Sequence, residues 1–202
     1  MIKAVLFDLD GVLLHHPELH HMALNKALKR YGYTITDHEH HTIFDGLPTK
    51  KKLAMLTTLK GLPDDLYGPI SDLKQKYTQE LIKVMCKPNQ EHIELINHLK
   101  RTGYKLAICS NSIRATIDAF TEVACLNGYF DVILSNEDVT EPKPSPEIYD
   151  KAIELLGIKP NEALILEDNE YGIKAAKASG AQVVVIDQGP EQITREFIKS
   201  FL

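Results

Sequence analysis

Five short apolar runs, separated by stretches with helical periodicity, are the feature of this chain that most constrains its fold. The runs are rich in branched aliphatic residues and do not alternate between apolar and polar positions. Strands that are buried on both faces of a parallel sheet have this pattern. The expected strands are residues 4–7, 105–109, 132–134, 163–166 and 182–186. We therefore expect an α/β protein with a doubly wound parallel sheet.

The segments between these runs carry apolar residues three and four positions apart, which is the periodicity of amphipathic helices. Gly103 follows one such segment as a C-terminal capping residue. A second segment begins at Ser145 and Pro146 and ends at Gly157, which again matches the residue preferences of helix ends. Strands and helices that alternate in this way form parallel sheets with helices on both faces.

One interval departs from this alternation, because residues 15–87 contain no strand-like run. Their apolar spacing predicts three helices, the second of them from about Pro48 to Gly61. We therefore expect a catalytic core of residues 1–14 and 88–202 that is interrupted by a helical cap of residues 15–87. Ligands of open α/β sheets bind beyond the carboxyl ends of the strands, and this insertion emerges there.

Composition and charge exclude several classes of function. The 202 residues suffice for one buried core with an insertion, and the formal net charge is −5 without a long basic run, so nucleic acid is not an expected partner. The first apolar run stops at Asp8, too early for a signal peptide or a membrane span. Cys86, Cys109 and Cys125 are far apart and form no disulfide framework, which favours a reducing compartment. We expect a cytoplasmic monomer or small homo-oligomer with no membrane partner.

Polar side chains that can carry chemistry follow four of the expected strands. In chain order they are Asp8 with Asp10, Ser110 with Asn111, Lys143, and Glu167 with Asp168. Each group alone is common in surface loops. Because the carboxyl ends of parallel strands meet at one edge of the sheet, the four groups together indicate a single site.

The residue types at this site predict Mg²⁺-dependent phosphoryl transfer. Carboxylates are ligands that Mg²⁺ prefers, and the expected metal-binding residues are Asp8, Asp10, Glu167 and Asp168. The Asp8 carboxylate can attack phosphorus, while Asp10 can protonate the leaving oxygen and later take a proton from water. Hydrogen-bond donors around the transferring phosphoryl group stabilise the charge on its oxygens. The expected phosphate-binding residues are Ser110, Asn111 and Lys143.

These residues also resemble the four motifs of the haloacid dehalogenase superfamily. Asp8-Leu9-Asp10-Gly11-Val12 is similar to its first motif, Ser110-Asn111 to its second, Lys143 to its third and Glu167-Asp168 to its fourth. The segments that begin at Lys143 and Glu167 resemble the subfamily with a helical cap, which includes β-phosphoglucomutase-like and phosphoglycolate-phosphatase-like proteins. The resemblance covers nearly the whole chain.

The resemblance implies a superfamily core with an inserted helical cap, a Mg²⁺ cofactor and an aspartyl-phosphate intermediate. It also bears on the type of reaction, because superfamily members that dehalogenate carbon lack an acid at the position of Asp10. Phosphatases and mutases of the superfamily have one. A phosphotransferase that acts on a small phosphorylated metabolite is therefore implied.

The cap sequence departs from the mutases in one respect. The β-phosphoglucomutase-like mutases carry an arginine three residues past a glycine, whereas here Gly46 is followed at that distance by Thr49, with Lys50 beside it. A lysine offers a point charge in place of the guanidinium fork. His20 matches a histidine at the cap hinge of the mutases. The expected substrate contacts in the cap are His20, Gly46 and Lys50.

Three functions remain open at this point. The first is hydrolysis of a small phosphomonoester, such as a sugar phosphate or a similar metabolite. The second is a β-phosphoglucomutase-like phosphosugar mutase. The third is a non-catalytic phospho-receiver module, which also combines acidic residues, a hydroxyl, a lysine and Mg²⁺ on a parallel sheet, but which carries no large helical insertion.

The histidines form two clusters in the expected cap, at residues 15–21 and 38–41. His16 and His20 have the four-residue spacing at which two imidazoles on a helix can share a metal ion. Solvated side chains and a contact of His16 or His20 with substrate are the alternatives.

Overall fold

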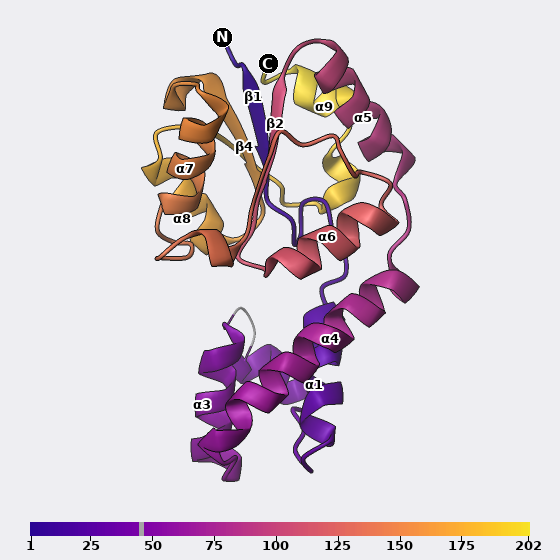
Figure 1. Ribbon diagram of the computed structural model, residues 1–202, viewed down its shortest axis with the longest axis vertical. Helices are drawn as coiled ribbons and strands as arrows, with labels where there is room; N and C mark the ends of the chain where they lie inside the picture. The colour runs from indigo at the N-terminus through magenta and orange to yellow at the C-terminus, as the bar shows by residue number, and fades with distance from the viewer. Residues whose placement is uncertain (45–46) are drawn as a thin grey trace. The chain divides into compact units, whose positions relative to one another are not determined.

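A single sheet of five parallel strands forms the centre of the structure (Figure 1). The computed structural model describes residues 1–44 and 47–202. The strand order is β3-β2-β1-β4-β5. The strands are β1 (Ala4–Phe7), β2 (Lys105–Cys109), β3 (Val132–Leu134), β4 (Ala163–Glu167) and β5 (Gln182–Val185). The predicted α/β fold is confirmed, and the predicted strands agree with the observed ones to within one residue at each end.

The central strand β1 brings the motif residues together. Phe7 pairs with Ile108 of β2 on one side and with Leu166 of β4 on the other, in parallel register. All four residues of β1 are buried, as expected for a strand covered on both faces. Because the three strands end at the same level, the chain segments that follow them leave from one edge of the sheet.

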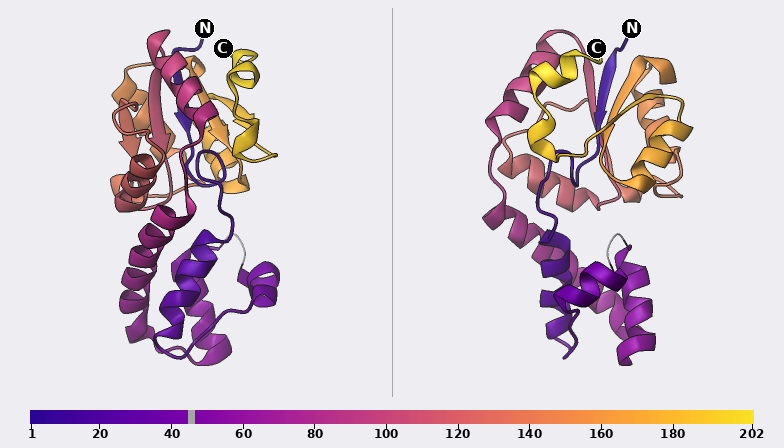
Figure 2. Two further views of the ribbon diagram at one scale, coloured as in Figure 1. Left: turned by 90° about the vertical axis from the view of Figure 1, so that its right-hand side faces the viewer. Right: turned by 180° about the vertical axis from the view of Figure 1, so that it is seen from behind.

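Helices cover both faces of the sheet (Figure 2). Helices α7 and α8 lie on one face, and α5, α6 and α9 lie on the other. Their bounds are α5 (Gln90–Arg101), α6 (Arg114–Val123), α7 (Glu147–Leu156), α8 (Glu170–Ala178) and α9 (Arg195–Lys199). Short 3₁₀ helices are found at Asn136–Asp138, Pro160–Glu162 and Pro190–Gln192. The predicted end of α7 at Gly157 is observed, with a left-handed φ of 63° that favours glycine.

Residues 17–85 form a second compact unit, which we call the helical unit. It contains α1 (Leu19–Lys29), α2 (Asp37–Glu39), α3 (Thr49–Lys60) and α4 (Tyr67–Met85). A π-helix at His40–Phe44 and a 3₁₀ helix at Asp64–Leu66 complete it. The helical unit has its own apolar core, which includes Leu24, Phe44, Leu53 and Ile70. The short helices α2 and His40–Phe44 add to the three helices that the sequence predicted.

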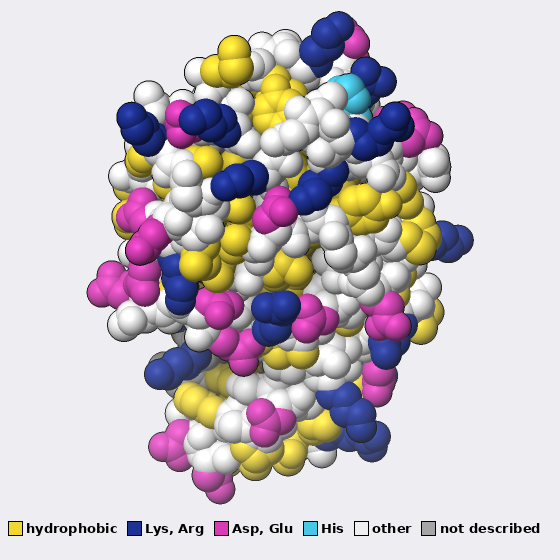
Figure 3. All heavy atoms as spheres, turned by 45° about the horizontal axis from the view of Figure 1, so that its top comes forward, with side chains coloured by type: hydrophobic (Ala, Val, Ile, Leu, Met, Phe, Trp, Pro, Cys, Tyr) yellow, Lys and Arg dark blue, Asp and Glu magenta, His cyan; other side chains and the backbone are white. Residues whose placement is uncertain are grey.

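The other unit, which we call the core unit, comprises residues 1–16 and 86–202. The assignment of catalytic and cap roles to residues 1–14 with 88–202 and to residues 15–87 stays a prediction. Among the described residues, no helix is both long and apolar enough to cross a membrane. In Figure 3, basic and acidic side chains are interspersed over the visible face, without a broad surface of one sign.

Candidate active site

The turn after β1 places Asp8 and Asp10 beyond the sheet. The Asp8 amide donates to the Leu166 carbonyl at 3.0 Å, which continues the ladder between β1 and β4, and the Asp8 side chain is buried. The chain then reverses, and Gly11 has a φ of 86°. A Cβ atom on Gly11 would lie 1.8 Å from Asp168 Oδ2. Only glycine therefore allows the first and fourth motifs to approach this closely.

Lys143 is the buried cation of the site. Its Nζ donates to Asp8 Oδ1 at 2.6 Å, to Glu167 Oε1 at 2.5 Å and to the Cys109 carbonyl at 2.8 Å. Asn111 holds the Lys143 backbone from both sides, because its amide group donates to the Lys143 carbonyl at 3.3 Å and accepts from the Lys143 amide at 3.1 Å. The structure thus joins Asp8, Lys143 and Glu167, which are far apart in the sequence.

Glu167 is fully buried, and its two carboxylate oxygens accept several hydrogen bonds. The Tyr149 hydroxyl donates to Oε1 at 2.7 Å, in addition to Lys143. The Asp168 amide donates to Oε2 at 3.1 Å, and the Asn169 side chain donates to the same oxygen at 3.2 Å. These bonds orient Glu167 so that one of its oxygens faces Lys143.

A serine that the sequence analysis missed contacts Asp10. Ser112 Oγ donates to Asp10 Oδ2 at 2.9 Å, and the Ser112 amide donates to Ser110 Oγ at 3.0 Å. Ser110 itself is buried. Tyr149 was also missed as a site residue, because it falls on the apolar stripe of α7. The signal available for Ser112 was its place two residues after Ser110, at the end of the same strand.

The charges of this site are unbalanced. Burial raises the pKa of Asp8 well above its usual value, and the nearby carboxylates of Glu167 and Asp10 raise it further, although Lys143 opposes them. Burial lowers the pKa of Lys143, but Asp8 and Glu167 outweigh burial and raise it, so the ammonium stays charged. Burial also raises the pKa of Asp168 to about 6. The Lys143 ammonium therefore pairs with two carboxyl groups, those of Asp8 and Glu167, while Asp10 and Asp168 add two more to the site.

Three of these carboxyl groups have the arrangement of a metal site. Asp8, Glu167 and Asp168 each offer one oxygen, and these oxygens all lie within 4.8 Å of one another. Their chemistry fits Mg²⁺, which prefers oxygen ligands, and a divalent cation would offset the excess negative charge. Asp10, a fourth predicted ligand, does not belong to this group of three, and its carboxylate contacts Ser112 instead.

Comparison with known proteins gives the family of the chain. Residues 5–186 match the haloacid dehalogenase-like hydrolase family. The chain belongs to this family. The resemblance of its four motifs is thereby confirmed, and the protein is an enzyme of the phosphatase type, in a family that typically depends on Mg²⁺.

Individual relatives of this haloacid dehalogenase-like hydrolase cover almost its whole length. It is 32% identical to the CbbY protein of Cereibacter sphaeroides over 92% of this chain and 84% of the relative. It is 31% identical to the phosphoglycolate phosphatase of Aquifex aeolicus over 91% of this chain and 84% of the relative.

Among solved structures, the chain is similar to CbbY from Rhodobacter sphaeroides. The complex of that protein with phosphate has a TM-score of 0.82 at 28% identity. A mutant of it in complex with xylulose-(1,5)bisphosphate has a TM-score of 0.81 at 27% identity. Both comparisons cover 92% of this chain and 86% of the other chain.

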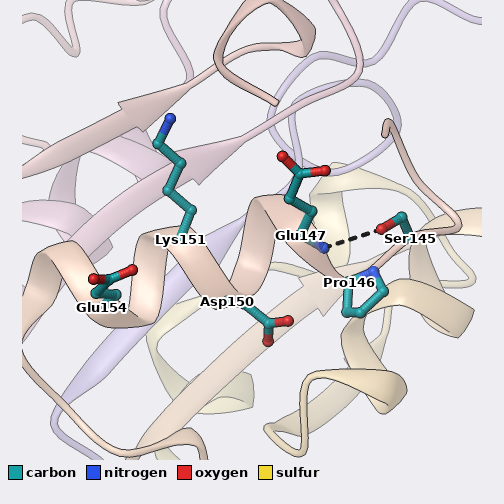
Figure 4. Close-up of a pocket in the computed structure, with 6 residues that line it drawn as sticks. All are labelled: Ser145, Pro146, Glu147, Asp150, Lys151 and Glu154. Atoms are coloured by element: carbon teal, nitrogen blue, oxygen red, sulfur yellow. Dashed lines mark hydrogen bonds between the residues drawn. The ribbon is translucent and has the colours of Figure 1, made fainter. Parts of the chain in front are cut away.

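A surface cavity of the hydrolase lies elsewhere, over α7 (Figure 4). It has a volume of about 440 Å³, and its lining residues are Ser145, Pro146, Glu147, Asp150, Lys151 and Glu154. Three carboxyl groups and one lysine give it the wrong charge for a phosphate ester. None of the predicted site residues lines it, so this cavity is not the phosphate site.

Two of the three predicted substrate contacts of the helical unit, His20 and Lys50, lie among the described residues. His20 Nδ1 lies 3.5 Å from Nζ of the buried Lys74, a pairing that the sequence did not indicate. Lys50 is exposed in the first turn of α3. Gly46 lies outside the described residues. The substrate roles of His20, Gly46 and Lys50 stay predictions.

Proposed function

We propose that the chain is a Mg²⁺-dependent phosphatase that hydrolyses a small phosphomonoester through an aspartyl phosphate on Asp8. The observation that carries this proposal is the position of Asp8 at the end of the central strand. There its carboxylate lies 2.6 Å from the buried Lys143 ammonium and in one oxygen cluster with Asp168. A buried carboxylate with a fixed cation beside it suits attack on an anionic phosphate ester.

In the first step, an Asp8 carboxylate oxygen attacks phosphorus in line with the ester oxygen. The bond from phosphorus to Asp8 forms, the ester P–O bond breaks, and Asp10 gives its proton to the leaving alkoxide. Lys143 offsets the charge on the transferring oxygens, and the loop Ser110–Asn111 supplies further donors. Mg²⁺, held by Asp8 and Asp168 with Glu167 nearby, would screen the repulsion between the phosphate and the nucleophile.

In the second step, water attacks the phosphorus of the aspartyl phosphate. Asp10 takes the proton from this water, the bond between phosphorus and Asp8 breaks, and inorganic phosphate and a free Asp8 carboxylate result. The hydrogen bond from Ser112 Oγ at 2.9 Å orients the Asp10 carboxylate for this proton transfer. Asp10 thus acts first as an acid and then as a base.

The proposed substrate class is a small phosphorylated metabolite, with sugar phosphates first. Two similar proteins support this class by name, one as a phosphoglycolate phosphatase and one as a complex with xylulose-(1,5)bisphosphate. The relatives differ among themselves in the compounds that their names give. For this chain we propose the shared chemistry, a phosphomonoester on a small polar carbon skeleton.

A phosphosugar mutase is the second candidate. It uses the same nucleophile but returns the phosphoryl group to the sugar, and His20 keeps this candidate open because it matches the hinge histidine of the mutases. Thr49 and Lys50 replace the arginine pattern of that group, which favours hydrolysis. Membership of a hydrolase family leaves no support for the phospho-receiver alternative.

The deciding experiment measures phosphate release from a panel of phosphorylated metabolites, with Mg²⁺ and with EDTA. The variants are Asp8→Asn and, as a control, Asp187→Asn, which changes an exposed aspartate just after the edge strand β5. We expect phosphate release to depend on Mg²⁺. The Asp187→Asn variant should retain this activity, and the Asp8→Asn variant should lose it. Full activity of Asp8→Asn would contradict the proposed nucleophile. Isomer formation from a hexose 1-phosphate and its bisphosphate, without net phosphate release, would instead identify a mutase.

A further inference from the structure

We propose that the helical unit carries a second metal site, for a transition-metal ion such as Zn²⁺, formed by Glu18, His40 and His41. Each of these residues offers one ligand atom, and the three atoms lie within 4.8 Å of one another. Glu18 immediately precedes α1, whereas His40 and His41 open the π-helix. The chain therefore brings a carboxylate and two imidazoles together from separate elements of one compact unit.

The His40 ring is held in place by packing. It is only 6% exposed, and it stacks on the His21 ring with 4.1 Å between the ring centroids and an interplanar angle of 14°. His21 is fixed in turn, because its Nε2 lies 3.4 Å from Asp37 Oδ1 and 3.2 Å from Asn25 Nδ2. A ring whose orientation is set by its surroundings loses little freedom when it binds a metal.

The backbone before His40 is equally well defined. Thr36 and Glu39 form a capping box around α2, with the Thr36 amide donating to Glu39 Oε2 at 2.7 Å. Lys60 Nζ donates to the same Glu39 oxygen at 2.7 Å and ties this segment to α3. The π-helix that follows is a rare element that is found frequently at functional sites.

The other two ligands are exposed and can adjust. Glu18 occupies the N-cap position of α1 but makes no side-chain capping bond, and its Oε1 lies 3.9 Å from His41 Nε2. Their side chains are 48% and 59% exposed. Ligand atoms around a tetrahedral metal with bonds of about 2.0–2.1 Å are about 3.3 Å apart. The exposed side chains therefore need to move by at most about 1.5 Å to bind one ion.

The donor set determines which ion the site prefers. Two imidazole nitrogens and one carboxylate oxygen suit Zn²⁺ and also bind Co²⁺, Ni²⁺ and Cu²⁺. Mg²⁺ prefers oxygen ligands alone, so the ion proposed for the core unit does not compete well here. With three protein ligands on an exposed surface, water fills the remaining coordination position. An ion at this site would tie the start of α1 to the π-helix and stabilise the folded helical unit.

The test uses the full chain with excess Mg²⁺ present, which occupies the carboxylate cluster of the core unit. Zn²⁺ binding is measured by calorimetry and by metal analysis after dialysis, and the visible spectrum of bound Co²⁺ reports the geometry. The variants are His41→Ala and Glu18→Gln, both at exposed positions, so that folding is preserved. His38→Ala is the matched control, because His38 is exposed and lies in the same segment.

We expect one Zn²⁺ ion per chain, with an affinity that falls by at least about 100-fold in His41→Ala and Glu18→Gln and is retained in His38→Ala. Mg²⁺-dependent phosphate release should be the same in all three variants, which separates this site from the proposed function. Unchanged Zn²⁺ affinity in both ligand variants would overturn the proposal. An equal loss in His38→Ala, or loss of the ion in Asp8→Asn alone, would overturn it as well.

Discussion

Ser112 donates a hydrogen bond to Asp10 at 2.9 Å, and this bond joins the loop after β2 to the loop after β1. The Ser112 amide in turn donates to Ser110 Oγ, so the proposed acid–base residue is held by the segment that also carries the proposed phosphate donors. The proposed phosphate binding and the proposed proton transfer therefore depend on one short loop. Movement of this loop would affect both.

The first prediction concerns Ser112. Ser112→Ala should lower kcat by about 10- to 100-fold, because a hydrogen bond to a charged group contributes about 1.5–3 kcal/mol and each 1.4 kcal/mol is tenfold in rate. KM should change little, because Ser112 is not among the proposed phosphate-binding residues. Steady-state kinetics with the best substrate of the panel checks this. Ser112→Thr keeps the hydroxyl and should restore most of the rate, and an Ala variant with wild-type kcat would refute the role.

Tyr149→Phe should destabilise the core unit. The Tyr149 hydroxyl donates to the buried Glu167 at 2.7 Å, and its loss leaves this carboxylate with fewer donors. We expect the free energy of unfolding to fall by about 1.5–3 kcal/mol. Urea unfolding followed by circular dichroism measures the change. Tyr171→Phe, at a side chain that is 49% exposed, is the control and should unfold like the wild type.

Gly172→Ala should disrupt the site through Glu167. A Cβ atom on Gly172 would lie 1.8 Å from Glu167 Oε1, the oxygen that accepts from Lys143. Overpacking of this kind costs about 1–3 kcal/mol, and the displaced carboxylate no longer holds Lys143 in place. Both the melting temperature and phosphate release should fall. Gly68→Ala, where a Cβ atom meets nothing within 4 Å, should leave both unchanged or raise the melting temperature slightly.

His92 should make the stability of the core unit dependent on pH. Burial lowers the pKa of His92, and this outweighs the opposite effects of the Pro190 carbonyl, Glu191 and Glu91. The unfolded chain therefore binds a proton at His92 more readily than the folded chain does. Stability from this group is present above pH 6.5 or so and is lost as the pH falls below that value.

Urea unfolding at several pH values between about 5 and 8 tests this expectation. The His92 Nε2 atom lies 2.9 Å from the Pro190 carbonyl. The His92→Gln variant has no titratable group here, so its free energy of unfolding should fall less toward acid pH. His98→Gln, on the same helix, leaves His92 in place and should retain the loss. A pH dependence that is identical in His92→Gln would show that other groups cause it.

The sequence predicted the sheet well because buried parallel strands leave a clear apolar signature, and the motif residues because they follow those strands directly. It did not predict which atoms meet. Tyr149 occupies the apolar stripe of α7, and only its packing against the sheet shows that its hydroxyl reaches Glu167. Glu18 and His40 lie on different elements, so no spacing rule relates them. The π-helix at His40–Phe44 likewise has no periodicity that distinguishes it from a turn.

The central position of β1 has a consequence for the motions of the protein. Amide groups in the middle of a five-stranded sheet exchange with solvent only when the surrounding strands separate, whereas edge strands such as β3 and β5 open more readily. The backbone of Val5, Leu6 and Phe7, buried and paired on both sides, should therefore be among the slowest to exchange hydrogen for deuterium. Asp8 extends from this slowly exchanging segment. Local opening at the edges of the sheet would leave its carboxylate where it is.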